Sequence, residues 1–376
     1  MTITGRIPGK PGLWEVRWDA GRIDSVTAVD PWRGDKRADT HGRWITPGLF
    51  DLQLNGIGGI NYTSAEITVD QLARADGLIR ACGVTRYCPT LITCGLETAC
   101  AVLDVFNTAW ERGAIPGAWG IHLEGPWISP EDGFRGVHRL EFVRDPDVGV
   151  LERLHERARG RIRLLTVAPE RPGAEELIRH AVARGIVVCL GHTSASPSDI
   201  ATAIRAGARM STHLFNGCAR LVDRHRNPIF SQLSEDGLYA GFIADGHHIP
   251  FSTLRIGLRA KGMERSVLVS DIAFLSGLAD GEYEMEGNTV ELRAGGLWVK
   301  GSWMLSGAAR TLDRDVELLA RESEPGMEQA LLMATRNPAA AAGDPGWADL
   351  VPGRGGPVAV FSWDGDRLGL EERLGF

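Results

Sequence analysis

Four ionisable residues occur where short apolar runs of the sequence end. Glu124 lies in GIHLEGPWIS (120–129), His192 in CLGHTSAS, His213 in STHLFNG and Asp271 in VLVSDIA. One carboxylate and two imidazoles form a three-ligand set with an open position, typical of a catalytic Zn²⁺ or Fe²⁺ site, where the pKa of a bound water falls to about 7. We therefore predict a metal site with Glu124, His192 and His213 as ligands and Asp271 as the general base.

Each of these residues also has a purely structural explanation. A single histidine at a strand end is more often a satisfied polar residue than a metal ligand, and a lone aspartate commonly caps the next helix. Four such residues at the same end of successive strands are hard to explain as caps, so the sequence favours metal binding.

His122 lies two residues before Glu124, so both side chains point to the same side of a strand. It is either a further metal ligand or a hydrogen-bond partner of the site. The second role is favoured, because the three-ligand set is complete without His122 and metal ligands usually need outer hydrogen-bond partners.

Eight short apolar runs alternate with amphipathic helical patterns. The runs cover residues 44–56, 84–93, 118–125, 161–170, 186–193, 209–216, 238–246 and 266–273, and helical patterns cover residues 69–82, 96–113, 174–185, 196–207 and 250–262. This alternation predicts an α/β protein with a closed (β/α)8 TIM barrel. A doubly wound sheet fits less well, because no Gly-x-Gly-x-x-Gly follows a strand. Strand carboxyl ends converge on one face of a barrel, which would bring the four ionisable residues together.

The two ends of the chain have a different character. Short stretches punctuated by turns occupy residues 1–45 and 352–376, which predicts one small β-sandwich domain built from both termini, with the barrel at 46–351. A strand-like insert at about 281–300 predicts a β-hairpin over the barrel mouth or alongside it. The segment SPEDGFRGVHRLEFV (129–143) predicts a long loop of the kind that carries function.

Composition excludes several classes of partner. The chain has 376 residues, and 41 basic against 48 acidic residues give a net charge of −7, with no basic block, so no nucleic-acid partner is indicated. No apolar run approaches the length of a membrane span, and the start of the sequence lacks the apolar core of a signal peptide. We expect a cytoplasmic protein whose six cysteines are reduced thiols.

An ordered set of motifs closely resembles a known family. PGLFDLQLNGIGG, HLEGPWIS, VAPE, GHTSAS, THLFNG, ADGHH and VSDIAFLSG are similar, in the same order, to signatures of the N-acetylglucosamine-6-phosphate deacetylase family of the amidohydrolase superfamily. The resemblance covers nearly the whole chain. It implies a metal-bearing barrel, a terminal β-sandwich, a homodimer and hydrolysis of an acetamide on an amino sugar. The family's ligands match Glu124, His192 and His213, and its catalytic aspartate matches Asp271.

The resemblance also concerns the number of metal ions. Most amidohydrolases carry a His-x-His pair after the first strand, whereas the matching positions here are Gln53 and Asn55. Amides bind divalent cations far less well than imidazoles. We therefore expect one divalent metal ion per chain, with Zn²⁺ preferred and Fe²⁺ as the alternative, and Gln53 and Asn55 as outer partners of the site.

Further residues resemble the family's substrate contacts. His138 would help to polarise the acetyl carbonyl or contact the sugar, and His248 would reach the sugar or its phosphate. Arg226 looks like the family arginine that reaches a phosphate across the dimer interface. Asn216 and Gly217 would offer backbone N–H groups to the same anion.

Two segments depart from the family pattern and keep alternatives open. GCARLVDRHRNPIF (217–230) is longer than usual and lacks a Glu-Pro-Gly turn, and SDIAFLSG replaces the usual Thr-Asp-Ala and brings Phe274 and Leu275 beside the base. A bulkier or less charged acylamino substrate is therefore an alternative. The sequence leaves open the sugar epimer, the 6-phosphate and the metal.

Other functions share the same barrel. A cyclic-amide hydrolase or N-acyl amino-acid deacylase often has a carbamylated lysine as a bridging ligand, but no lysine ends a strand here. A non-catalytic scaffold of this fold normally loses ligands or base, and all four residues are present. A phosphosugar isomerase or aldolase has no need of a Glu, His, His set. We therefore expect an amino-sugar deacetylase acting on a small molecule.

Overall fold

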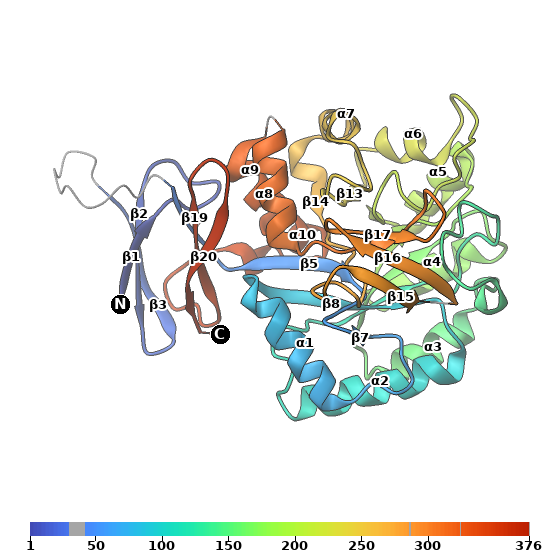
Figure 1. The fold of residues 1–376 in the computed structure, drawn as a ribbon, viewed down its shortest axis with the longest axis horizontal. Coiled ribbons are helices and arrows are strands. Elements are labelled where there is room, and N and C mark those ends of the chain that lie inside the picture. Colours follow the sequence, from blue (N-terminus) through green and yellow to red (C-terminus); the bar gives the residue numbers. More distant parts are fainter. Residues whose placement is uncertain (30–41, 286, 324, 376) are drawn as a thin grey trace.

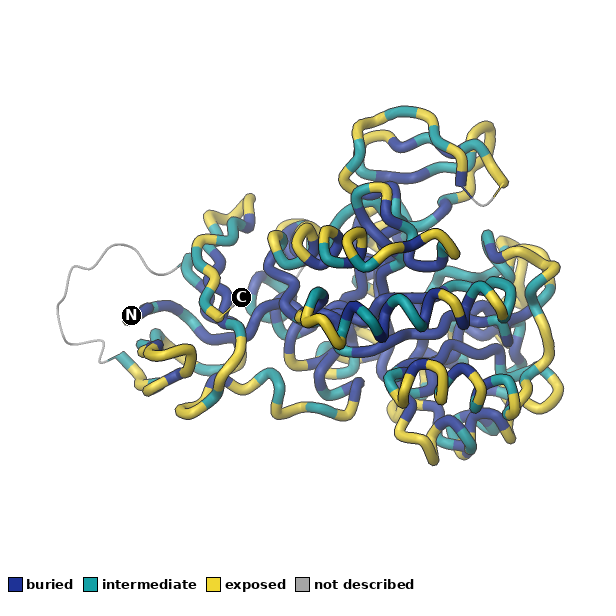
Figure 2. The backbone as a smooth tube through the Cα atoms, turned by 90° about the horizontal axis from the view of Figure 1, so that it is seen from below, coloured by how far each residue is buried: buried dark blue, intermediate teal, exposed yellow. Residues whose placement is uncertain are grey.

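The computed structural model describes residues 1–29, 42–285, 287–323 and 325–375. The barrel and its surrounding helices form the larger part of the molecule. A smaller β region, which contains both termini, lies at the other end (Figure 1). Buried residues run through the interior of the barrel, and exposed residues mark the outer faces of its helices (Figure 2). Among the described residues, no helix is long and apolar enough to cross a membrane.

Eight parallel strands form the barrel, in the order of the sequence. They are β5 (Leu49–Leu54), β8 (Val84–Ile92), β9 (Ile121–Glu124), β10 (Ile162–Val167), β11 (Val187–Leu190), β12 (Met210–Ser211), β13 (Tyr239–Phe242) and β14 (Ser266–Leu268). Two backbone bonds link the first strand to the segment after the last: Asp271 N–H donates to Gln53 O (2.9 Å) and Asn55 N–H to Ile272 O (2.8 Å). The TIM-barrel prediction is confirmed.

Helices pack around this sheet. They are α1 (Val69–Ala81), α2 (Leu96–Glu111), α3 (Val148–Arg157), α4 (Ala174–Ala183), α5 (Pro197–Ala206), α6 (Pro228–Leu233), α7 (Phe251–Lys261), α8 (Leu312–Glu322), α9 (Gly326–Met333) and α10 (Arg336–Ala341). Local sequence explains their ends. In α5, Ser196 and Asp199 form a capping box, Pro197 occupies the first turn and Gly207 ends the helix with φ +111°.

The smaller β region contains two antiparallel sheets. One contains β1 (Thr2–Gly5), β2 (Trp14–Asp19) and β3 (Arg22–Ala28), and the other contains β4 (Arg43–Thr46), β19 (Val358–Trp363) and β20 (Leu368–Leu374). A separate apolar core joins them, with members such as Val16 and Val360. Strands from both ends of the chain thus share one sheet, as expected. The exact boundaries of the predicted domain stay a prediction, and its residues 30–41 lie outside the described part.

The apolar run at 44–56 serves both regions. It divides at Pro47-Gly48 into β4, which belongs to the small sheet, and β5, which begins the barrel. Gly48 has φ +88°, and a Cβ there would lie 2.1 Å from the Thr85 side chain, so glycine is required at the junction.

The range expected to hold a hairpin, about 281–300, contains three antiparallel strands, and a fourth follows it in the same sheet. They are β15 (Gly281–Met285), β16 (Asn288–Arg293), β17 (Gly296–Val299) and β18 (Leu305–Ala308). Residue 286, inside the predicted insert, lies outside the described residues. The sheet is joined to the barrel rim because Ala273 N–H donates to Ala308 O (2.8 Å) and Ala308 N–H donates to Asp271 O (3.1 Å). The insert is therefore joined by a hydrogen bond to the backbone of Asp271, the predicted base.

Candidate metal centre and catalytic site

The three predicted metal ligands and the predicted general base lie together at the carboxyl end of the barrel strands. Glu124 is the last residue of β9, His192 and His213 follow β11 and β12 by two residues, and Asp271 follows β14 by three. His192, His213 and Asp271 have positive φ values of 49°, 24° and 48°. Such left-handed conformations cost about 1–3 kcal/mol for a residue with a side chain and cluster at functional sites. The backbone thus turns sharply where each of these side chains must enter the site.

Glu124, His192 and His213 form a buried candidate metal centre. Their ligand atoms all lie within 4.8 Å of one another. Oε1 of Glu124 is 3.0 Å from Nε2 of His213 and 3.3 Å from Nε2 of His192, and the two Nε2 atoms are 3.1 Å apart. Two imidazole nitrogens and one carboxylate oxygen therefore point at one small region, as a divalent metal requires.

A loop carbonyl fixes the orientation of His192. Its Nδ1 donates to the carbonyl oxygen of Phe134 at 2.9 Å, so Nε2 is the nitrogen free to bind a metal. Gly136 and Gly217 both pack against the ring and have φ values of +60° and +56°. A Cβ at Gly217 would lie 2.9 Å from Nδ1 of His192. The two loops thus hold the imidazole in place only if glycine occupies these positions.

The electrostatics of the centre call for positive charge. Burial alone would raise the pKa of Glu124, but the imidazoles of His192 and His213, whose Nε2 atoms lie within 3.3 Å of its Oε1, hold it well below its usual range. Burial would lower the pKa of His213, yet the hydrogen bond and charge of Glu124 raise it to about 9. Glu124 is therefore an anion in a buried site; the protonated His213 balances its charge here, and a bound divalent metal would take over that role.

Two amide side chains contact Asp271. Nε2 of Gln53 lies 3.1 Å from its Oδ1, and Nδ2 of Asn55 lies 2.9 Å from the same oxygen. Nε2 of Gln53 also donates to Oε1 of Glu124 at 3.0 Å. Burial raises the pKa of Asp271, and the negative charge of Glu124 adds to this effect, whereas His213 opposes it. A carboxylate with a raised pKa is a stronger base than an exposed aspartate.

His138 lies beside the metal centre. Its ring packs edge-on against His192 with 4.4 Å between ring centroids, and its Nδ1 lies 2.9 Å from the Thr93 hydroxyl. Burial lowers the pKa of His138 to about 3, and nearby His192 adds to the shift, so the ring is neutral at pH 7. His138 is therefore able to hydrogen-bond a ligand without carrying charge.

Both ring nitrogens of His122 have partners of their own. Nδ1 lies 3.0 Å from Leu52 O, and Nε2 lies 2.8 Å from the Thr166 hydroxyl, which lies 2.7 Å from the Thr212 hydroxyl. Because Nδ1 must donate to a carbonyl, Nε2 accepts from Thr166. No lone pair remains for a metal, so the geometry favours the outer role over the ligand role.

The residues expected to bind substrate lie on neighbouring loops. The Asn216 N–H donates to His213 O (2.9 Å), whereas Nδ2 of Asn216 is buried without a partner among the described residues, so the side chain is the group on offer. Nδ1 of His248 is held by Asp245 at 2.7 Å. Arg226 lies in the exposed stretch 220–226, where its N–H donates to Asp223 (2.6 Å).

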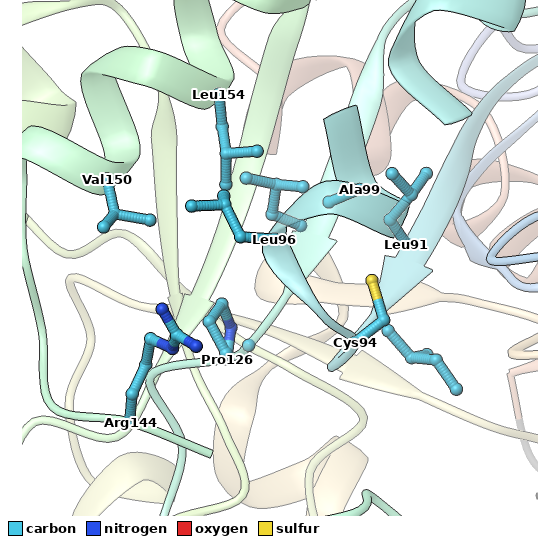
Figure 3. Close-up of a pocket in the computed structure, with 11 residues that line it drawn as sticks. Leu91, Cys94, Leu96, Ala99, Pro126, Arg144, Val150 and Leu154 are labelled. Atoms are coloured by element: carbon cyan, nitrogen blue, oxygen red, sulfur yellow. The ribbon is translucent and has the colours of Figure 1, made fainter. Parts of the chain in front are cut away.

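Figure 3 shows the residues that line a small, mainly apolar cavity. It is lined by residues of β8, β9, α2 and α3, among them Leu91, Leu123 and Leu154, and its volume is about 20 Å³. Leu123 faces it, while the next residue, Glu124, takes part in the metal centre. A space of this size holds roughly one water molecule, so it is no substrate pocket.

Sequence reasoning missed several contributors to the site. Thr93 and Asp245 orient histidines, and the carbonyl of Phe134 orients a ligand. Asp245 stands in the quoted motif ADGHH, so a carboxylate three residues before His248 was an available signal. Thr93 ends the apolar run 84–93, but a threonine there carries no pattern of its own, and a backbone carbonyl leaves none.

Comparison with known proteins gives consistent matches. N-acetylglucosamine-6-phosphate deacetylase of Bos taurus is 35% identical over 319 residues, covering 81% of this chain and 76% of that protein. N-acetylgalactosamine-6-phosphate deacetylase of Shewanella sp. (strain ANA-3) is 33% identical over 321 residues, covering 82% of this chain and 77% of that protein. No family model matches the chain.

A solved structure matches nearly the whole fold. It is that of a mutant N-acetyl-D-glucosamine-6-phosphate deacetylase from Mycobacterium smegmatis in complex with N-acetyl-D-glucosamine-6-phosphate. The TM-score is 0.85 at 29% sequence identity, and the match covers 98% of both chains. The similarity therefore includes the barrel and the smaller β region.

Proposed function

Because this chain belongs to the N-acetylglucosamine-6-phosphate deacetylase family of the amidohydrolase superfamily, we propose that it hydrolyses the acetamide of a phosphorylated N-acetyl amino sugar. The preferred substrate is N-acetylglucosamine-6-phosphate, and the products are glucosamine-6-phosphate and acetate. The observation that carries the proposal is the buried Glu124, His192, His213 centre with Asp271 beside it.

The residues of the centre fit one divalent metal ion. The hydrogen bond from His192 to Phe134 leaves its Nε2 lone pair directed at the centre, and the anionic Glu124 favours a cation. Zn²⁺ is the metal we propose for two imidazoles and a carboxylate, with Fe²⁺ as the alternative. When bound, such a metal supplies Lewis-acid activation of water and of the acetyl carbonyl.

Asp271 is the group proposed to move the proton. It takes a proton from the water that attacks the acetyl carbon, and it returns this proton to the nitrogen as the carbon–nitrogen bond breaks. The products are then the free amine and acetate. The raised pKa of Asp271 suits a group that must act first as base and then as acid.

His138 is proposed to stabilise negative charge on the acetyl oxygen. A donor aimed at the developing oxyanion typically contributes about 3–4 kcal/mol to catalysis. His248 and Asn216 are proposed to contact the sugar, Gly217 to offer its N–H to the phosphate, and Arg226 to bind the phosphate. Support comes from Asp245, which orients His248, and from the unpartnered, buried Nδ2 of Asn216.

A second substrate is favoured by one comparison. The Shewanella relative acts on N-acetylgalactosamine-6-phosphate, by its name, at nearly the same identity as the bovine relative. The two sugars differ only in the configuration of one hydroxyl. The galactosamine epimer is therefore the second candidate, ahead of other acylamino or cyclic amide substrates.

The cellular setting is also a proposal. None of the six cysteines, all of which lie among the described residues, forms a disulfide, which supports a reducing compartment such as the cytoplasm. The homodimer expected from the family resemblance stays a prediction.

Acetate release tests the proposal. The metal-loaded protein is incubated with the two 6-phosphates and with unphosphorylated N-acetylglucosamine, and acetate and free amine are measured. We expect equimolar acetate and amine from one 6-phosphate. Asp271→Asn is expected to keep the fold and the metal while kcat falls by about 10²-fold or more. Failure of all three sugars to react, or full activity in Asp271→Asn, would contradict the proposal.

A further inference from the structure

We infer that Gln53 and Asn55 are positioning residues for Asp271: together they hold one of its carboxylate oxygens, so that the other oxygen is the one that exchanges the proton. The inference rests on the proposed function of Asp271. It begins from two contacts to the same atom, Oδ1, at 3.1 Å from Nε2 of Gln53 and 2.9 Å from Nδ2 of Asn55.

The two oxygens of Asp271 have different surroundings. Oδ1 accepts both amide N–H groups, whereas no described residue donates a hydrogen bond to Oδ2. Asp271 is 9% exposed and its unbonded Oδ2 is not fully buried, so water or a ligand can reach this oxygen. An oxygen without donors is the better proton acceptor, because an N–H group already bound to Oδ1 stabilises its negative charge.

The backbone fixes where the two amides stand. Gln53 and Asn55 are separated by one residue at the end of β5, so their side chains point to the same side. Asp271 N–H donates to Gln53 O at 2.9 Å, and Asn55 N–H donates to Ile272 O at 2.8 Å. The same two bonds that link the barrel ends therefore set the distance between the amides and the carboxylate.

Gln53 has a second contact that Asn55 lacks. Its NH₂ group also donates to Oε1 of Glu124 at 3.0 Å, so one amide spans the predicted base and a predicted metal ligand. Two buried carboxylates repel each other, and an NH₂ group between them offsets that repulsion. Asn55 acts on Asp271 alone by the described contacts of its side chain, which makes Asn55 the cleaner residue to test.

Asn55→Leu tests the inference in the metal-loaded protein. The change keeps a similar volume and removes the N–H donor. We expect unchanged KM and metal content, with kcat lowered about 10- to 100-fold, because Asp271 then turns away from its productive orientation. Asn107→Leu is the matched control, since it removes another buried amide, which donates to Arg157 O (2.7 Å) in the helical layer, and should leave kcat unchanged.

Crystal structures provide a readout that does not depend on activity. In the wild type, one oxygen of Asp271 should accept hydrogen bonds from both amides while the other accepts none from the protein, and in Asn55→Leu the carboxylate should be rotated or adopt two orientations. If Asn55→Leu does not fold, Asn55→Asp replaces it as the test. This variant puts an acceptor in place of the donor and should displace the Asp271 carboxylate.

The outcomes separate this inference from the proposed function. A wild type that releases acetate while Asn55→Leu keeps full kcat would overturn the positioning role alone. Amides bonded to two different oxygens of Asp271 would overturn it as well. Suppose that one oxygen of Asp271 accepts hydrogen bonds from both amides in the wild-type structure, yet the protein deacetylates no sugar. That result would support the positioning role and contradict the proposed function.

Discussion

The hydroxyl oxygen of Thr93 lies 2.9 Å from Nδ1 of His138, and the direction of this hydrogen bond decides which ring nitrogen of the histidine carries the proton. The other acceptor for that hydroxyl, Glu124 O, is more distant at 3.4 Å. We therefore assign the Thr93 proton to the hydrogen bond with Nδ1, which leaves the His138 proton on Nε2. A neutral imidazole in this tautomer has an N–H to donate to an acetyl oxygen.

Thr93→Val should weaken this donor. Valine keeps the shape of threonine but cannot donate to Nδ1, so the ring is free to adopt the other tautomer and Nε2 loses its N–H for part of the time. We expect kcat to fall about tenfold with little change in KM. ¹⁵N chemical shifts of His138 would report the tautomer directly.

Thr108→Val is the control for Thr93→Val. Its hydroxyl donates to Asp104 O (2.9 Å) within α2, away from the centre, so the change should leave kcat and the His138 shifts unchanged. An unchanged kcat in Thr93→Val would remove the hydroxyl from the mechanism.

Metal content is the next prediction. Elemental analysis of the purified protein should find about one equivalent of Zn or Fe per chain, because one set of Glu124, His192 and His213 converges and the His-x-His positions hold amides. His213→Ala or Glu124→Ala should lose the metal. His180→Ala, which removes a histidine paired with Glu152 outside the barrel, should keep it. Two tightly bound ions per chain would contradict the mononuclear prediction.

The sequence predicted the barrel and the chemical residues because both leave periodic or positional signals. Apolar runs alternating with helices define strand ends, and ionisable residues at those ends must meet on one face. The conformations of His192, His213 and Asp271 leave no such signal, since His and Asp adopt left-handed backbone more often than most residues but still only in a minority of positions. Their turns are imposed by tertiary contacts.

The sequence could not predict the loop contacts or the full extent of the insert, because these too leave no local pattern. Nothing in SPEDGFRGVHRLEFV distinguishes Phe134 as the residue whose carbonyl orients His192, because every residue carries a carbonyl. The insert was expected as a two-stranded hairpin, and the structure adds β17 and β18; Ala308 of β18 forms hydrogen bonds with the backbone of Asp271 and Ala273. Pairing of that kind depends on segments far apart in the sequence.

Gly217→Ala tests whether the loop packing around His192 supports the metal. The new Cβ would lie 2.9–3.1 Å from three ring atoms, at a residue with φ +56°, so the imidazole has to shift. We expect metal affinity to fall about 10- to 100-fold, as for other changes in the partners of a ligand. Competition with a chelator measures the affinity.

Gly113→Ala separates the contact from the backbone strain. Gly113 has a similar φ of +64°, but a Cβ there meets nothing within 4 Å. This variant should lose about 1 kcal/mol or more of stability and keep the metal affinity of the wild type. Equal losses of metal affinity in both variants would show that strain, and not contact with His192, is responsible.

The final prediction concerns substrate charge. A guanidinium presents paired donors in a planar fork that matches phosphate oxygens, and Arg226 is the residue we expect to use it. The rival explanation is that Arg226 is an ordinary surface arginine, since it lies in an exposed stretch that also contains Arg220 and Arg224. Arg220 already has another partner, because its guanidinium stacks on Trp303 at 4.4 Å. The two explanations differ in how they treat the 6-phosphate.

If Arg226 binds the phosphate, Arg226→Ala should raise KM for the phosphorylated sugar much more than for the unphosphorylated analogue. The difference between the two effects should correspond to about 1.5–3 kcal/mol of binding free energy, as for a charge-assisted contact. Arg224→Ala is the matched control, with the same loss of charge two residues away, and should change both KM values equally. Size-exclusion chromatography of Arg226→Ala tells a lost phosphate contact from a dissociated dimer. Equal losses on both sugars in Arg226→Ala, or a wild type that prefers the neutral sugar, would mean that the chain has kept the family's chemistry and moved to a different acylamino substrate.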